Sequence, residues 1–142
     1  MPTLEDIGDA IGEAVATLEG LRIQQEWGSV PNVSGSTLVG VVEYDGTNYD
    51  SAYGGQAAEV NYKITIVGSS ASERATRKKL LALCDPTPGA SGIAGAVTGN
   101  LGGLVSFCRV VSNTGLRDFN LTGGEGAPTY PGIEITVAVM PT

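Results

Sequence analysis

The sequence offers few of the residue types that usually carry chemistry. Its 142 residues contain no histidine, and the cysteines are Cys84 and Cys108. The lack of histidine excludes Ser-His-Asp and Cys-His catalytic arrangements, histidine-containing zinc sites and imidazole pH switches. Two cysteines cannot form a four-cysteine metal site, which leaves two buried thiols or one disulfide as alternatives. The acids are scattered, and the sequence alone gives no reason to pair any two of them for acid–base chemistry.

Two short stretches are similar to ligand-binding loops but depart from them at the decisive positions. Residues 45–50 (DGTNYD) alternate oxygen ligands as a calcium loop does, yet Asp50 stands where that loop needs glycine and Gln56 where it needs glutamate. Residues 99–103 (GNLGG) lack the Lys-Ser/Thr pair of a phosphate-binding loop. We therefore expect a solvated hairpin loop at the first stretch and a structural turn at the second.

The net charge of −7 is confined to the first third of the chain. Residues 1–45 carry eight acids and one base, whereas residues 46–142 carry seven acids and seven bases. Four of those bases are close together in the sequence: Arg74, Arg77, Lys78 and Lys79. A solvated helix face, a protein contact and a nucleic-acid contact are the three interpretations of this cluster. The acidic balance and the lack of interleaved aromatic residues weigh against the third.

Two segments have the pattern of helices that would position these charges. Residues 4–19 place apolar side chains at spacings of three and four, with acids around the rest of the helix, Thr3 as N-cap and Gly20 as stop. Ser70 and Glu73 have the spacing of a capping box, which predicts a helix that continues to Cys84 and is stopped by Asp85-Pro86. Residues 87–103 are rich in small side chains and predict at most a short helical turn.

Five segments are typical of strands, and their order defines the fold class. The period of the apolar residues is two after Gly20, and the predicted strands cover residues 21–26, 38–44, 57–67, 104–111 and 133–139. Between them lie two long glycine-rich loops, 45–56 and 112–132. The order predicts a single α+β domain over residues 1–142, with a mostly antiparallel sheet of four to five strands and two helices on one face.

The sequence predicts neither a membrane span nor a signal peptide. Its longest apolar stretches are interrupted well before the ~18 residues that a transmembrane helix needs. Glu5, Asp6 and Asp9 stand where a secretory signal carries basic residues. We therefore expect no membrane partner.

The order of elements along almost the whole of residues 4–140 resembles the tail-terminator family of long-tailed bacteriophages. An amphipathic helix leads into Gly-Leu-Arg-Ile at 20–23, and an aliphatic strand leads through Gly-Ser-Ser at 68–70 into a capped helix that ends in Leu-Cys-Asp-Pro at 83–86. A segment of small residues then reaches Asn-Leu-Gly-Gly at 100–103, before a strand, a long loop and a terminal strand. Each element is weakly specific, and the resemblance depends on their order and register.

This resemblance implies a structural virion protein without an active site, so we expect no enzyme, no metal and no cofactor. Such a subunit forms a hexameric ring on the end of the tail tube, stops tube polymerisation and presents the surface that joins the head connector. Its partners would be further copies of itself, the tail tube protein and the neck proteins, with DNA only as passing cargo. It would be assembled in the host cytoplasm and located in the neck of the virion.

In a cyclic ring each interface joins two different surfaces of the subunit. An acidic surface can therefore contact one neighbour, and a basic surface can contact the other. We expect the acidic helix of one subunit to face the basic helix of the next, through Glu5, Asp9, Glu13, Arg74, Arg77, Lys78 and Lys79. Alternatively, the acids line the lumen and repel passing DNA. The glycine-rich loops are the candidate contacts with tail or neck, through Tyr49, Asp50, Tyr53, Arg117, Asp118 and Phe119.

Two other functions are compatible with the sequence. The first is another phage neck protein, such as a head-completion, stopper or connector protein, because these share the small size and the glycine-rich loops. The second is a small-ligand-binding or carboxylate-dependent hydrolytic domain. Tyr44, Tyr49 and Tyr53 cluster around the 45–56 loop and favour it, although tyrosine is also enriched at protein interfaces.

Overall fold

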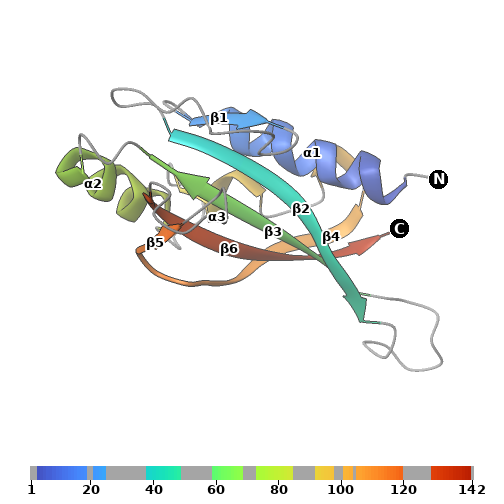
Figure 1. The fold of residues 1–142 in the computed structure, drawn as a ribbon. Coiled ribbons are helices and arrows are strands. Elements are labelled where there is room, and N and C mark those ends of the chain that lie inside the picture. Colours follow the sequence, from blue (N-terminus) through green and yellow to red (C-terminus); the bar gives the residue numbers. More distant parts are fainter. Residues whose placement is uncertain are drawn as a thin grey trace.

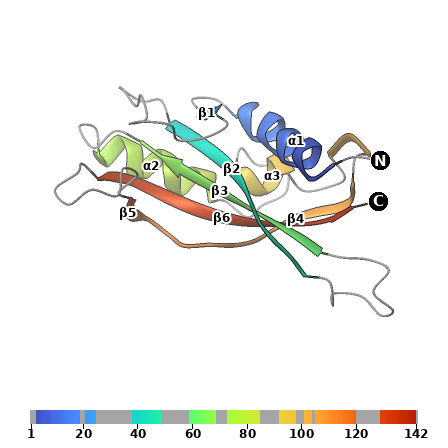
Figure 2. The same ribbon diagram turned by 45° about the vertical axis from the view of Figure 1, so that its right-hand side comes forward.

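The protein is an α+β domain in which helices cover one face of an open sheet. The computed structural model describes residues 3–18, 21–24, 38–48, 59–68, 73–84, 92–97, 101–103, 105–119 and 129–141 (Figures 1 and 2). The helices are α1 (Leu4–Ala16), α2 (Glu73–Leu83), α3 (Ile93–Val97) and the short 3₁₀ helix η3 (Leu101–Gly103). The strands are β1 (Leu21–Gln24), β2 (Leu38–Asn48), β3 (Glu59–Val67), β4 (Val105–Asn113), β5 (Arg117–Phe119) and β6 (Tyr130–Pro141).

The sheet has the order β1-β2-β3-β6-β4, with β5 also paired to β6. The first pair, β1 with β2, is parallel, and all other pairs are antiparallel. At the centre, the β3 residues from Val60 to Val67 pair without interruption with the β6 residues from Val139 to Gly132. The predicted fold class is therefore confirmed, with one more strand and one more helix than the sequence pattern indicated.

The prediction of a long loop over residues 112–132 is wrong for the part that the structure describes, because this part includes the end of β4, all of β5 and the start of β6. After β4 ends at Asn113, the Thr114 N–H donates to the Glu134 carbonyl (3.0 Å), and β5 then continues along β6. Gly115 has a φ of +74°, so it supplies the left-handed conformation that this short interruption requires. The strand β5 has three residues, of which Arg117 and Asp118 are exposed and Phe119 is partly buried, so it is too short to show an alternation of apolar and polar residues. The period-two pattern that identifies a strand is therefore missing.

The core lies between the sheet and the helices. Ile64 and Ile66 of β3 pair with Ile135 and Ile133 of β6, and residues two apart on a strand share a face. These four side chains are fully buried in one cluster with residues of all three α-helices, so the helices share a single face of the sheet. Among the described residues, no helix is both long enough and apolar enough to cross a membrane.

Helix α1 begins where the sequence predicts and ends earlier. Thr3 is the N-cap and forms a capping box with Asp6: the Asp6 N–H donates to Thr3 Oγ1 (3.1 Å), and the Thr3 N–H donates to Asp6 Oδ2 (2.9 Å). The second of these bonds holds the pKa of the Asp6 carboxyl below its ordinary value. The helix ends at Ala16 instead of residue 19. Thr17 is its C-cap, and its hydroxyl donates to the Ala14 carbonyl (2.7 Å). The Leu21 N–H then donates to the Leu18 carbonyl (3.3 Å) where the chain turns into β1. Gly20, the predicted stop, lies outside the described residues.

Helix α2 packs close to the end of β3. An added Cβ at Gly68 would overlap the Thr76 methyl group, and Thr76 is buried. The Gly68 N–H also donates to the Pro131 carbonyl (2.9 Å), which holds the backbone at this position. Because Gly68 has no side chain, Thr76 of α2 packs directly on that backbone. The helix begins at Glu73 and ends at Leu83, and Ser70 of the predicted capping box is outside the described residues.

Both cysteines are free thiols, which decides between the two alternatives left by the sequence. Cys108 is fully buried on β4, and burial raises the pKa of its thiol to about 11. Cys84 is partly buried after α2, and burial raises its pKa as well.

The sheet is also buried on its second face near the start of β6. Val67 of β3 pairs with Gly132 of β6, and Phe119 of β5 approaches the same position. A Cβ at Gly132 would overlap the Ile66 carbonyl and lie 2.9 Å from Val67 and 3.0 Å from Phe119. This corner therefore depends on the missing side chain of Gly132, and β3 is buried on both faces at this end, from Ile64 to Val67.

Two glycine substitutions should have opposite effects on stability. Gly132→Ala should lower the free energy of unfolding by about 1–3 kcal/mol, because the new methyl group meets backbone on a paired strand. Gly12→Ala should raise it by about 1 kcal/mol, because its Cβ makes an ordinary 3.4 Å contact with Ile23 and alanine favours the helix. Urea denaturation of the two variants measures both. Equal effects of the two substitutions would contradict this account of the corner.

Candidate functional site

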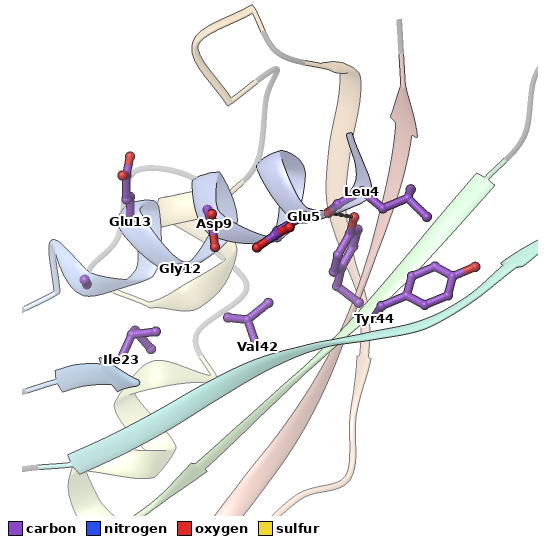
Figure 3. Close-up of a pocket in the computed structure, with 11 residues that line it drawn as sticks. Leu4, Glu5, Asp9, Gly12, Glu13, Ile23, Val42 and Tyr44 are labelled. Atoms are coloured by element: carbon purple, nitrogen blue, oxygen red, sulfur yellow. Dashed lines mark hydrogen bonds between the residues drawn. The ribbon is translucent and has the colours of Figure 1, made fainter. Parts of the chain in front are cut away.

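A groove of about 880 Å³ runs between α1 and the strands β1 and β2 (Figure 3). Its acidic lining residues are Glu5, Asp9 and Glu13, and its other lining residues are Leu4, Gly8, Gly12, Ala16, Ile23, Val42, Tyr44 and Tyr62. The set contains three carboxylates and no basic side chain. The groove therefore combines a negative rim with a largely apolar floor.

The rim is a single stripe on α1. Glu5, Asp9 and Glu13 are four residues apart and all exposed, so they stand one above the next on the same side of the helix. At 1.5 Å per residue the stripe is about 12 Å long. Figure 3 shows the three side chains extending from α1, with Ile23 and Val42 on the strands opposite. Carboxylates in this arrangement attract a cation or a row of basic side chains.

The floor is accessible because the helix has small residues beside the acidic stripe. Gly8, Gly12 and Ala16 are also four apart, and they line the groove on the side of α1 that faces the strands. An added Cβ at Gly8 would lie 3.3 Å from the Tyr62 ring, and one at Gly12 would lie 3.4 Å from Ile23. The small residues therefore let the helix lie close to the sheet, and Val42 remains only partly covered.

Tyr62 joins the two walls of the groove. Its ring is 2% exposed, and its hydroxyl donates to the Leu4 carbonyl in the first turn of α1 (2.6 Å). Burial, with a smaller effect from Tyr44, raises the pKa of Tyr62 to about 12. The Tyr44 ring meets the Tyr62 ring edge to face, with centroids 6.1 Å apart, and Tyr44 is 51% exposed. Tyr44 therefore supplies an aromatic surface at the open end of the groove.

The predicted basic cluster lies elsewhere on the helix layer. Arg74, Arg77 and Lys78 are exposed on α2, and Lys79 is partly buried. Figures 1 and 2 place α2 at one end of the sheet and α1 toward the other, with α3 between them. Within one subunit the structure therefore brings the three acids together and the bases together, but does not bring the two groups into contact.

The candidate tail and neck contacts are only partly described. Tyr49, Asp50 and Tyr53 lie outside the described residues. The other three, Arg117, Asp118 and Phe119, form β5 at the edge of the sheet. Arg117 and Asp118 are exposed, whereas Phe119 is partly buried against the Gly132 corner. The first two have the exposure that a contact needs, and Phe119 also serves the fold.

Sequence reasoning missed the groove itself and the role of Tyr62. The acids on α1 were identified, but the residues opposite them come from three strands: Ile23 lies on the neighbouring β1, whereas Val42, Tyr44 and Tyr62 lie on β2 and β3, far away in the chain. The spacing of Gly8, Gly12 and Ala16 was the available signal, since a stripe of small residues marks a close approach. Among the described residues, no group of three or more acids and cysteines has the arrangement of a metal site.

Comparison with known proteins identifies no family for the chain. A scan against models of protein families finds no match, and a search of curated proteins finds no relative. The resemblance to tail terminators therefore stays a prediction from the order of elements.

The buried tyrosine should make stability depend on alkaline pH. Below pH 10 the side chain is neutral in the folded and the unfolded chain, so its titration does not affect stability there. Between pH 10 and about 12 it loses its proton more readily when unfolded, so the free energy of unfolding should fall. Tyr62→Phe should cost about 1 kcal/mol at neutral pH through the lost hydrogen bond and should make the fall above pH 10 shallower. Urea denaturation from pH 7 to 12 tests both, and identical pH slopes for the two proteins would contradict the assignment.

Proposed function

We propose that this protein is a structural subunit of a bacteriophage neck, with the role of a tail terminator. Copies of the chain form a hexameric ring on the end of the completed tail tube, stop its polymerisation and present the surface that joins the head. The protein acts through contacts and not through catalysis. Its partners are further copies of itself, the tail tube protein and the neck proteins, and DNA passes through the ring as cargo.

One observation carries this proposal: each subunit has two surfaces of opposite charge on separate helices. Glu5, Asp9 and Glu13 are exposed on α1, and Arg74 and Lys78 are exposed on α2. Surfaces that are complementary but far apart on one subunit suit head-to-tail association, which closes into a ring when the rotation between neighbours divides a full turn. Exposed Arg117 and Asp118 on β5 are then available to the tube or the neck.

Two alternative functions remain, another neck protein and a small-ligand-binding protein. Another neck protein, such as a stopper or connector, would use the same two surfaces with a different partner at the tube end. A small-ligand-binding protein is favoured by the volume of the groove, which lies in the range of ligand pockets, and by its two tyrosines. The acidic rim would then select a cationic ligand.

Growth of tail tubes in the presence of the chain tests the proposed function. Tube protein from the phage that encodes this chain should polymerise to indefinite length alone and should stop at short lengths when the chain is added. Negative-stain microscopy with a gold-labelled antibody should show the chain on one end of each tube.

An acidic protein of the same size, added at the same concentration, is the control for non-specific effects of charge. Unchanged tube lengths with no label at tube ends would refute the tail-terminator role. Label at tube ends without any change in length would favour another neck protein.

A further inference from the structure

The exposed face of α2 combines one apolar side chain with a surrounding group of cations. Leu81 is 59% exposed, more than any other large hydrophobic side chain among the described residues. With 100° between successive helical residues, Arg77, Leu81, Arg74 and Lys78 fall in this order within an arc of about 100°. The opposite side of the helix carries Thr76, Leu80 and Leu83, which are buried. Leu81 is therefore the centre of a basic, apolar patch, defined here as Arg74, Arg77, Lys78 and Leu81.

The groove on α1 has the complementary composition. Its rim carries Glu5, Asp9 and Glu13, its floor includes Ile23 and Val42, and its lining includes no basic residue. The lengths agree as well. The acidic stripe is about 12 Å long, and the span from Arg74 to Leu81 is seven residues, or about 10–11 Å.

We propose that the groove of one subunit binds the basic, apolar patch of α2 from a second copy of this chain. Leu81 enters between α1 and the strands and packs on Ile23 and Val42, while Lys78 and Arg74 lie along the carboxylates of the rim. The contact is between copies because α1 and α2 lie toward opposite ends of the sheet in one subunit (Figures 1 and 2). The inference rests on the proposed function in one respect: it takes the second copy to be the next subunit of the ring.

The mixed composition of the contact gives it a defined response to salt. Ion pairs at the rim are screened at high ionic strength, where the Debye length falls to about 3 Å at 1 M. Burial of Leu81 is not screened. Salt should therefore weaken the association without abolishing it, whereas a purely ionic contact would be lost.

Charge reversal on each side of the contact is the main test. Asp9→Lys alone and Lys78→Glu alone should each weaken self-association about tenfold in sedimentation equilibrium, because each places like charges opposite one another. An equimolar mixture of the two variants should associate as the unmodified protein does, since every contact between alternating copies again joins opposite charges. Glu43→Lys is the matched control, because Glu43 is exposed on a strand residue that points to the other face of the sheet.

A second pair of variants tests the apolar part of the contact. Leu81→Gln keeps a good helix former on α2 and should weaken association about tenfold, at low and at high salt alike. Phe107→Gln removes a similarly exposed apolar side chain from β4, at 48% exposure, and should have no effect on association. Circular dichroism of each variant confirms that it is folded.

The possible outcomes separate this inference from the proposed function. A protein that stays monomeric up to its solubility limit, or a mixture of Asp9→Lys and Lys78→Glu that fails to associate, overturns the contact. Tube capping by a chain that fails these tests would leave the proposed function standing with a different interface. Association that behaves as described, without capping of tubes, would keep the contact and refute the tail-terminator role. Binding of a small cation in the groove of the monomer, together with self-association that is unchanged in Asp9→Lys, would favour the ligand-binding alternative and overturn the docking of α2.

Discussion

The hydrogen bond from Tyr62 to the Leu4 carbonyl fixes the N-terminal end of α1 on the sheet, while burial of Ile7, Ile11 and Val15 holds the rest of the helix. A tyrosine hydroxyl that is removed from water must find an acceptor, because a buried polar group without a partner is costly. Leu4 supplies that acceptor in the first turn of α1, and Gly8 leaves room for the tyrosine ring below the next turn. The helix is thereby held over β2 and β3 at its N-terminal end. Leu4, Gly8 and Tyr62 all line the groove, so this contact forms one end of it.

The same placement explains why the rim is accessible to a partner. Ile7, Ile11 and Val15 point into the core, so the acids of α1 must lie on its outer sides. The stripe of Gly8, Gly12 and Ala16 separates these acids from the strands and contributes little side-chain volume. A helix with larger residues there would fill the groove with its own side chains. Small residues next to charged ones thus leave a negative, partly apolar surface on an otherwise well-packed helix.

The charge separation between α1 and α2 follows from how the helices share one core. Both helices bury their apolar sides against the same face of the sheet, and both keep charges outside. Their positions toward opposite ends of that face prevent the charges from neutralising one another within a subunit (Figures 1 and 2). The net charge of −7 therefore conceals two surfaces of opposite sign, an acidic one on α1 and a basic one on α2. This description gives the proposed ring and the proposed contact a common physical basis.

The sequence by itself determined the local features. Periodicity predicted α1, α2 and five of the strands, because each amphipathic element shows its own repeat, and Thr3 was recognisable as an N-cap from its position alone. The acids of α1 and the bases of α2 were visible as clusters because helical neighbours are close in sequence.

Only the tertiary structure decided what depends on distant residues. It showed β5 along β6, the close approach at Gly132, and the union of Glu5, Asp9 and Glu13 with Ile23 and Val42 in one groove. The physical reason is that these contacts join segments whose separation in the chain leaves no periodic trace. Strand pairing and helix packing set which residues meet, and both depend on the whole core.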